Sequence, residues 1–228
     1  MSRATGKHAA GENDNFPTPR WALARFLDEW PALGQVGNRW VEPCAGDGVL
    51  IETANQYRDD LIWTAVEVRD TRQDLIRSGV GSSRALFADV FDLDFGDDDP
   101  AFVPYDVALL NPPFRLTMEF LELCRKIARK TVLLQRMNFI GSGKRNDYMR
   151  ANTPDCWIVP DRVSFSQDNG NDSVENAWHV WPPDGDVARI HVLQTTPLAE
   201  RKADRARVRA ALGVDHAEVE RDSGLSGT

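Results

Sequence analysis

The tetrapeptide Asn111-Pro112-Pro113-Phe114 brings together three groups that suit one chemical task. It follows the apolar run at residues 107–110, which is typical of a buried strand that two prolines end abruptly. Because a residue before proline avoids helical backbone, we expect Asn111 at the carboxyl end of that strand. Asn111 Oδ1 and the Pro112 carbonyl can each accept one amine hydrogen, and Phe114 can stack on a ring. The motif predicts a site that binds a planar group carrying an NH2. A proline-terminated strand with a core phenylalanine is the simpler interpretation.

A second motif is a glycine-containing loop between a predicted strand and a predicted helix, with the sequence VEPCAGDGVL at residues 41–50. Gly46 and Gly48 permit a tight turn and let a ligand approach the backbone closely. Open α/β sheets bind their ligands at this edge, beyond the carboxyl ends of the strands. Glu67 ends the next predicted strand, where a carboxylate can bind a ribose. The loop alone is a weak signal, but the loop, the acid and the tetrapeptide in this order are a strong one.

The elements that must position these motifs alternate along the chain. Strands are expected at residues 39–42, 61–68, 84–88, 105–110 and 131–135, and helices at 21–30, 49–57, 71–78 and 116–129. Strands that alternate with helices through short loops predict an α/β fold with a mainly parallel central sheet and helices on both faces.

The last third of the chain has a different pattern. Strands without intervening helices are expected at residues 157–159, 164–165, 177–181 and 188–193, which predicts an antiparallel hairpin at the sheet edge. A basic helix at 198–212 and a polar tail follow. We therefore expect a disordered leader at 1–14, one catalytic domain at 15–197, and a C-terminal helix and tail at 198–228.

Composition excludes several classes of protein. The chain has 228 residues, 42% hydrophobic and 27% charged, which suits one well-filled α/β domain. It has no apolar run near the roughly 20 residues of a membrane span, and no apolar signal region. Its three cysteines are far apart and form no zinc-type cluster, so we expect no metal and a reducing, cytoplasmic setting.

Charge is unevenly distributed. The net charge of -8 argues against a strongly nucleic-acid-binding protein as a whole. Residues 89–106 contain seven Asp and no Lys or Arg, whereas residues 115–150 contain nine basic and three acidic side chains. The basic run is either a solvated face or a surface that meets phosphates.

Over residues 15 to about 183, these motifs resemble S-adenosylmethionine-dependent DNA adenine-N6 methyltransferases, especially the short phage and prophage type. The most specific match is the tetrapeptide, which fits the family's [Asn/Asp/Ser]-Pro-Pro-[aromatic] motif. The resemblance implies a Rossmann-like class I methyltransferase fold and S-adenosylmethionine as cofactor. It also implies DNA as substrate and a role of the restriction-modification kind.

The resemblance assigns roles to individual residues. Cofactor contacts fall on Phe16, Pro17, Thr18, Pro19, Glu42, Ala45, Gly46, Gly48, Glu67, Asp89, Val90 and Asn111. Catalysis falls on Asn111, Pro112, Pro113 and Phe114, and substrate contacts fall on Phe114, Arg136, Lys144, Arg145, Arg162 and Phe165. Within these sets, Glu67 would hold the ribose hydroxyls and Asp89 would read the cofactor's adenine amine. Each assignment has a structural alternative, such as a plain strand-end acid or a core phenylalanine.

The implied reaction is direct methyl transfer to the adenine N6 amine, whose lone pair is delocalised into the ring. Hydrogen bonds to Asn111 Oδ1 and the Pro112 carbonyl would favour a pyramidal nitrogen, and orientation would supply much of the acceleration. In a duplex the base must flip out, and Phe114 and Phe165 would recover its stacking. Cytosine-C5 chemistry would need a cysteine at position 111, but Cys44 lies in the cofactor loop.

The chain departs from larger family members in one respect. Neither residues 90–110 nor those after Trp181 can hold a recognition domain, so we expect sequence choice from loops 139–150 and 167–175 or from a specificity partner protein. The alternatives are methyl transfer to adenine in RNA or to glutamine in a protein, and a non-catalytic binding protein of the same fold. Glutamine enzymes usually have Tyr at the fourth position of the motif, where this chain has Phe114. The oligomeric state is left open.

Overall fold

The computed structural model describes residues 17–80, 84–161, 163 and 175–211. The strands are β1 (Arg39–Glu42), β2 (Ile62–Glu67), β3 (Ala85–Phe87), β4 (Tyr105–Leu110), β5 (Ala128–Arg136), β6 (Asp155–Val159), β7 (Asn176–Trp181) and β8 (Ile190–Val192). The α-helices are α1 (Arg20–Glu29), α2 (Val49–Asn55), α3 (Arg72–Arg77), α4 (Thr117–Ile127), α5 (Asn146–Ala151) and α6 (Leu198–Ala211). Short 3-10 helices are η2 (Val90–Asp92), η3 (Phe114–Leu116), η4 (Met137–Phe139) and η5 (Gly143–Arg145).

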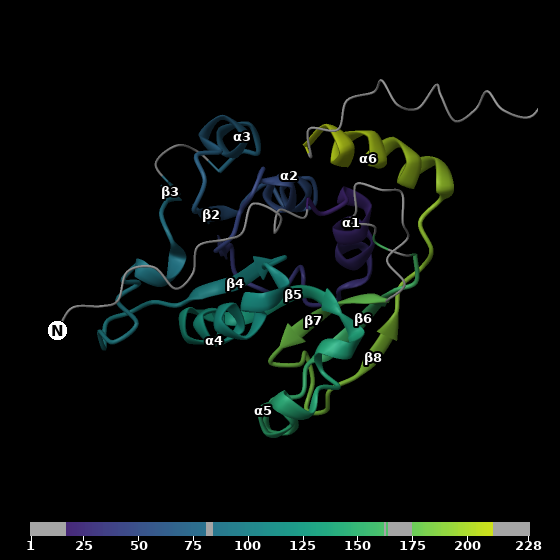
Figure 1. Cartoon of the computed structure of the whole chain (residues 1–228). Helices are drawn as coiled ribbons and strands as arrows, with labels where there is room; N and C mark the ends of the chain where they lie inside the picture. The colour runs from purple at the N-terminus through teal and green to yellow at the C-terminus, as the bar shows by residue number, and fades with distance from the viewer. Residues whose placement is uncertain (1–16, 81–83, 162, 164–174, 212–228) are drawn as a thin grey trace, which may run out of the picture.

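The strands form one eight-stranded sheet in the order β3-β2-β1-β4-β5-β7-β6-β8 (Figure 1). Strands β1 to β5 are parallel, and the consecutive strands β1 and β2, β2 and β3, and β4 and β5 are neighbours in the sheet. Their carboxyl ends therefore lie at one edge, where Glu42, Glu67 and Asn111 are found. This arrangement confirms the predicted α/β fold with a mainly parallel sheet.

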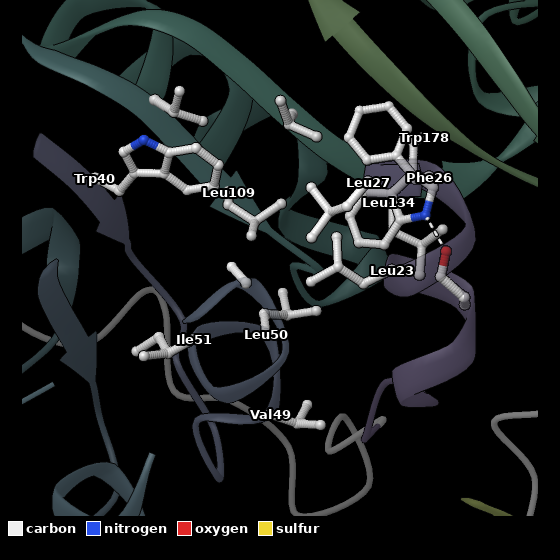
Figure 2. Close-up of a cluster of buried hydrophobic side chains, with 14 of the residues drawn as sticks. Leu23, Phe26, Leu27, Trp40, Val49, Leu50, Ile51, Leu109, Leu134 and Trp178 are labelled. Carbon is white, nitrogen blue, oxygen red and sulfur yellow. Dashed lines mark hydrogen bonds between the residues drawn. The ribbon is translucent and has the colours of Figure 1, made fainter. Parts of the chain in front are cut away.

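Side chains alternate between the two faces of the sheet, and each face has its own core. In β4, Val107 and Leu109 pack in the cluster beneath α1 and α2, whereas Ala108 and Leu110 pack against α4. Figure 2 shows the first cluster, where Trp178 Nε1 donates to the Ala22 carbonyl at 2.9 Å. Helices thus cover both faces, as predicted, because strands buried on both sides need apolar cover on both sides.

The second half of the sheet contains the predicted antiparallel hairpin. Strand β7 lies between β5 and β6 and is antiparallel to both. The outermost strand differs from the prediction, because β8 is parallel to β6. Asp155 holds the connection from β7 to β8, since its carboxylate accepts from the Asp184 amide at 2.8 Å and from the Arg189 amide at 2.7 Å. Lys130 also pairs with Asp184 at 2.6 Å.

Two other expectations are wrong in detail. The predicted helix at 116–129 ends at Ile127, and β5 begins at Ala128 instead of residue 131, because Ala128 already pairs with Tyr105 of β4. The expected loop at 139–150 contains η5 and most of α5, a helix too short to give a periodic apolar signal.

Several expectations are not tested by the fold. The leader at 1–14 and the strand at 164–165 lie outside the described residues, and the division into three segments stays a prediction. No helix in the described ranges is both long and apolar enough to span a bilayer.

Candidate active site

The loop between β1 and α2 is shaped by its two glycines. Gly46 has φ +56° and Gly48 has φ +77°, which is the left-handed region that other residues adopt with strain. A Cβ at Gly48 would also lie 2.6 Å from Ser78 Oγ, just after α3. Glycine at position 48 is therefore required by both conformation and space. Ala45 is 2% exposed, and its amide donates to the Val66 carbonyl at 2.9 Å.

Glu67 ties this loop to the end of β2. Its Oε2 accepts from the Gly46 amide at 2.7 Å, while its Oε1 accepts from the Arg69 amide at 3.0 Å and from Arg69 Nε at 2.9 Å. A carboxylate has about four lone-pair sites, so these three bonds leave about one site for a ligand hydroxyl. The structure therefore gives Glu67 a role in holding the loop that sequence reasoning missed.

Glu42 is an unusual acid at the end of β1. It is 2% exposed, and its Oε2 has no hydrogen-bond partner among the residues that the structure describes. Burial raises the pKa of Glu42 well above its usual value, and the nearby carboxylates of Asp47 and Glu67 raise it further. A buried acid among other acids is stabilised by a cation, so this part of the site suits a positively charged ligand.

The segment before α1 lies against the tetrapeptide. Pro17, Thr18 and Pro19 are buried, and Asn111 Nδ2 donates to Thr18 Oγ1 at 2.9 Å. This bond holds the plane of the Asn111 amide. Phe16, predicted to contact the cofactor, lies outside the described residues.

The tetrapeptide continues into η3, which a buried polar chain holds in place. Thr117 Oγ1 donates to the Phe114 carbonyl at 2.9 Å, and Gln135 Nε2 donates to Thr117 Oγ1 at 2.6 Å. Thr117 is 1% exposed and Gln135 3% exposed. Sequence reasoning missed both residues, although a glutamine near the end of an apolar strand was an available signal. Strand β5 thus supports the motif that ends β4.

Two of the predicted substrate residues are arginines that lie over aromatic rings. The guanidinium carbon of Arg136, the last residue of β5, is 4.9 Å from the centre of the Phe114 ring. Arg145 lies 4.4 Å from the centre of the Phe139 ring, and its Nε donates to the Phe139 carbonyl at 2.9 Å. The structure therefore joins Arg136 to the tetrapeptide, while Arg145 supports η4.

The other predicted substrate residues are less informative. Lys144 is exposed, and Arg162 and Phe165 lie outside the described residues. Some of the basic side chains at residues 115–150 form hydrogen bonds within the fold, since Arg125 donates to Tyr148 and Asn152.

The predicted adenine-reading acid lies close to Glu67. The Ala88 amide donates to the Glu67 carbonyl at 3.1 Å, which places Asp89 beside the end of β2. Asp89 Oδ1 accepts from the Phe91 amide at 3.1 Å and caps η2. The Val90 side chain is 4% exposed and belongs to the core, so only its backbone is left to meet a ligand.

The strand β7 of the predicted hairpin is buried. Trp178, His179 and Trp181 are each at most 1% exposed. His179 stacks on Trp181 with ring centres 5.7 Å apart, and burial lowers the pKa of His179 to about 4. Strand β7 therefore supports the site from within the core, because both of its faces are covered.

Comparison with known proteins shows the fold. The sequence matches no family model and no curated protein. The type I restriction-modification methyltransferase subunit from Streptococcus thermophilus is similar with a TM-score of 0.58 and 13% identity, over 86% of this chain and 53% of that one. The chain thus spans about half the length of that subunit.

Two other solved structures agree in fold. A candidate class I S-adenosylmethionine-dependent methyltransferase from Listeria monocytogenes gives a TM-score of 0.57 and 16% identity, over 90% of this chain and 74% of that one. A candidate RNA methyltransferase from Pyrococcus horikoshii gives a TM-score of 0.50 and 14% identity, over 69% and 83%. The fold is therefore that of class I S-adenosylmethionine-dependent methyltransferases, as the sequence predicted.

Proposed function

We propose that this protein uses S-adenosylmethionine to methylate the exocyclic N6 amine of adenine in DNA. The observation that carries the proposal is the held Asn111 amide. Thr18 accepts from Asn111 Nδ2, Asn111 directly follows β4, and Pro112 is the next residue. An amide oxygen and a backbone carbonyl in adjacent residues, with an aromatic ring two residues further on, suit an amine on a planar base.

The charge at the carboxyl ends of β1 and β2 supports the choice of cofactor. S-adenosylmethionine, when bound, supplies an electrophilic methyl group on a positively charged sulfur. Glu42 would hold the cationic methionine end, Glu67 the ribose hydroxyls and Asp89 the adenine amine. The buried Glu42 Oε2, without a partner in the described part of the chain, fits this role because a cation would stabilise it.

The residues at the ends of β4 and β5 would act on the acceptor. Asn111 Oδ1 and the Pro112 carbonyl would each accept one amine hydrogen and so direct the nitrogen lone pair outward. Phe114 would stack on a flipped base, which is worth roughly 1–3 kcal/mol. Arg136, already over the Phe114 ring at 4.9 Å, would lie beside the base and near a phosphate.

DNA is favoured over other acceptors by the tetrapeptide's resemblance and by the fold's similarity to the restriction-modification subunit. Because this chain spans about half of that subunit, we also propose that sequence choice comes from residues 139–150, from residues 167–175, of which 167–174 lie outside the described residues, or from a specificity partner. Adenine in RNA is the second candidate, favoured by the fold's similarity to the Pyrococcus horikoshii protein.

The test is methyl transfer from labelled S-adenosylmethionine to unmethylated genomic DNA, total RNA and protein extract in parallel. The products are digested and resolved by mass spectrometry, with Asn111→Ala as the inactive control. N6-methyladenine in DNA is the expected product. Label only in RNA or protein would overturn the choice of acceptor, and no label with cofactor bound would overturn the proposed activity of this chain alone.

A further inference from the structure

One arginine of the C-terminal helix α6 contacts the active-site edge of the sheet. Arg207 Nη1 donates to Asp47 Oδ2 at 3.2 Å, and Arg207 Nη2 donates to the Thr18 carbonyl at 2.5 Å. Its Nε donates to Asp204 Oδ1, one turn earlier in the helix, at 2.9 Å. All three guanidinium nitrogens therefore have partners, and those partners come from three segments far apart in the sequence.

This contact is partly buried, and it sets one positive charge between two negative ones. The Arg207 side chain is 21% exposed, and its partners Asp47 and Asp204 are 31% and 8% exposed. A guanidinium has a rigid fork of donors, which suits it to hold several acceptors in a fixed arrangement. Arg207 is thus occupied within the fold and does not add to a phosphate-binding surface.

Both segments that Arg207 holds belong to the candidate site. Asp47 lies between Gly46 and Gly48 in the loop after β1, and Thr18 accepts from the Asn111 amide at 2.9 Å. Residues of α6 and of the carboxyl ends of β1 and β4 are therefore linked through a short series of hydrogen bonds. Figure 1 shows α6 lying near α1 and α2, on the side of the molecule where that loop enters α2.

We propose that Arg207 is a positioning residue, which sets the cofactor loop through Asp47 and the Asn111 amide through Thr18. The effect on Asn111 rests on the function proposed above, whereas the effect on the loop rests only on cofactor binding. Loss of the guanidinium would free the Thr18 carbonyl and the Asp47 carboxylate, and both segments would lose their common support.

A second arginine on the same helix provides a matched control. Arg201 Nε donates to the Thr196 carbonyl at 3.0 Å, and its Nη1 lies 3.4 Å from Asp161 Oδ1. Arg201 thus makes the same kind of contact, one carbonyl and one carboxylate, without touching the candidate site. Glu200 also pairs with Arg25 of α1 at 2.8 Å, so α6 has other attachments when Arg207 is lost.

The experiment compares Arg207→Ala, Arg207→Lys and Arg201→Ala in the full chain. Binding of S-adenosylhomocysteine is measured by calorimetry, exchange of the amides at residues 44–49 by mass spectrometry, and kcat and KM by methyl transfer. Arg207→Ala should weaken S-adenosylhomocysteine binding about tenfold and speed exchange of the loop, because it loses charge-assisted hydrogen bonds. Arg201→Ala should leave both the S-adenosylhomocysteine affinity and the rate of loop exchange within about twofold of the wild-type values. Arg207→Lys, a point charge without the fork, should fall between Arg207→Ala and the wild type.

A further variant separates the two effects of Arg207. Thr18→Val keeps the carbonyl that Arg207 holds but removes the hydroxyl that Asn111 contacts. It should lower kcat without changing loop exchange. It also tests the proposed effect on the Asn111 amide if Arg207→Ala fails to fold.

The outcomes distinguish this proposal from the proposed function. Wild-type affinity and wild-type loop exchange in Arg207→Ala would overturn the role of Arg207. If the wild-type protein methylates no acceptor while Arg207→Ala still loses S-adenosylhomocysteine affinity, the proposed function fails and the role of Arg207 on the loop stands.

Discussion

The two halves of the candidate site differ in charge and in the way they are held. At the ends of β1 and β2, Glu42 and Glu67 are buried acids beside a glycine loop. At the ends of β4 and β5, an amide, an aromatic ring and the Arg136 guanidinium lie together. The first half suits a cation, and under the proposed function the second would hold a planar base with phosphates nearby. One sheet edge can thus hold two unlike reactants, because neighbouring strand ends need not share an electrostatic character.

The substitution with the largest expected effect on this difference is Asn111→Ala. We expect methyl transfer to fall about 100-fold or more, because the acceptor amine loses its orientation. S-adenosylhomocysteine affinity should change by less than about threefold, since the acids on the other half are unaffected. Asn38→Ala is a control at the opposite end of β1, where Asn38 Nδ2 donates to the Asp60 carbonyl at 3.1 Å. Equal loss of affinity and rate in Asn111→Ala would contradict the division of the site.

Glu42→Gln tests the other half. We expect S-adenosylmethionine affinity to fall about tenfold, because the neutral amide no longer attracts the cationic end. The free energy of unfolding without cofactor should rise by about 1–3 kcal/mol at a pH above the raised pKa of Glu42, where the substitution removes a buried charge. Calorimetric binding and urea unfolding measure the two effects. A variant that loses both stability and affinity would show that Glu42 has a partner in the protein.

The raised pKa of Glu42 also predicts a pH dependence. The folded protein holds this proton to higher pH than the unfolded chain, so the contribution of Glu42 to stability is lost as pH rises through the raised pKa. Cofactor affinity should change in the opposite direction and increase over the same range, because only the ionised acid attracts the cation. In Glu42→Gln, both pH dependences should become flatter.

Thr117→Val tests how the acceptor half is supported. The variant keeps the shape of the side chain but removes the link between Gln135 and the Phe114 carbonyl, so we expect a loss of about 1–3 kcal/mol in the free energy of unfolding. The KM for the acceptor should rise while S-adenosylhomocysteine affinity is kept. Thr53→Val in α2 is the matched control, since Thr53 Oγ1 donates only to the Val49 carbonyl of its own helix at 2.7 Å. If both variants behave alike, the buried chain has no special role.

Arg136→Gln should have the smallest effect. We expect the KM for DNA to rise about three- to tenfold and the salt dependence of binding to weaken by about one ion, with no change in cofactor affinity. Arg129→Gln at the other end of β5 is the control, because Arg129 lies 3.7 Å from Asp106, away from the tetrapeptide. Binding titrations at several salt concentrations measure the salt dependence of DNA binding in both variants. An unchanged salt dependence would remove Arg136 from the acceptor half.

The pattern of local elements was accessible from the sequence because it depends on neighbouring residues. The run before Asn111 predicts β4 at its observed bounds, and the proline pair explains why the strand stops there. The same holds for β1, whose last residue, Glu42, is followed by the glycine loop. Errors arose where the local signal is weak. Ala128 is a good helix former, but pairing with β4 draws it into β5.

The sequence by itself determined the order of strands and helices up to β5, the two motifs at strand ends, and hence the α/β class and the edge where the candidate site lies. Only the tertiary structure decided which groups meet there. Thr18 and Asn111 are 93 positions apart, and Arg207 lies 160 positions from Asp47, so no local pattern links them. Hydrogen bonds of this kind depend on how distant segments pack, whereas strands, turns and glycine loops depend on the backbone preferences of adjacent residues.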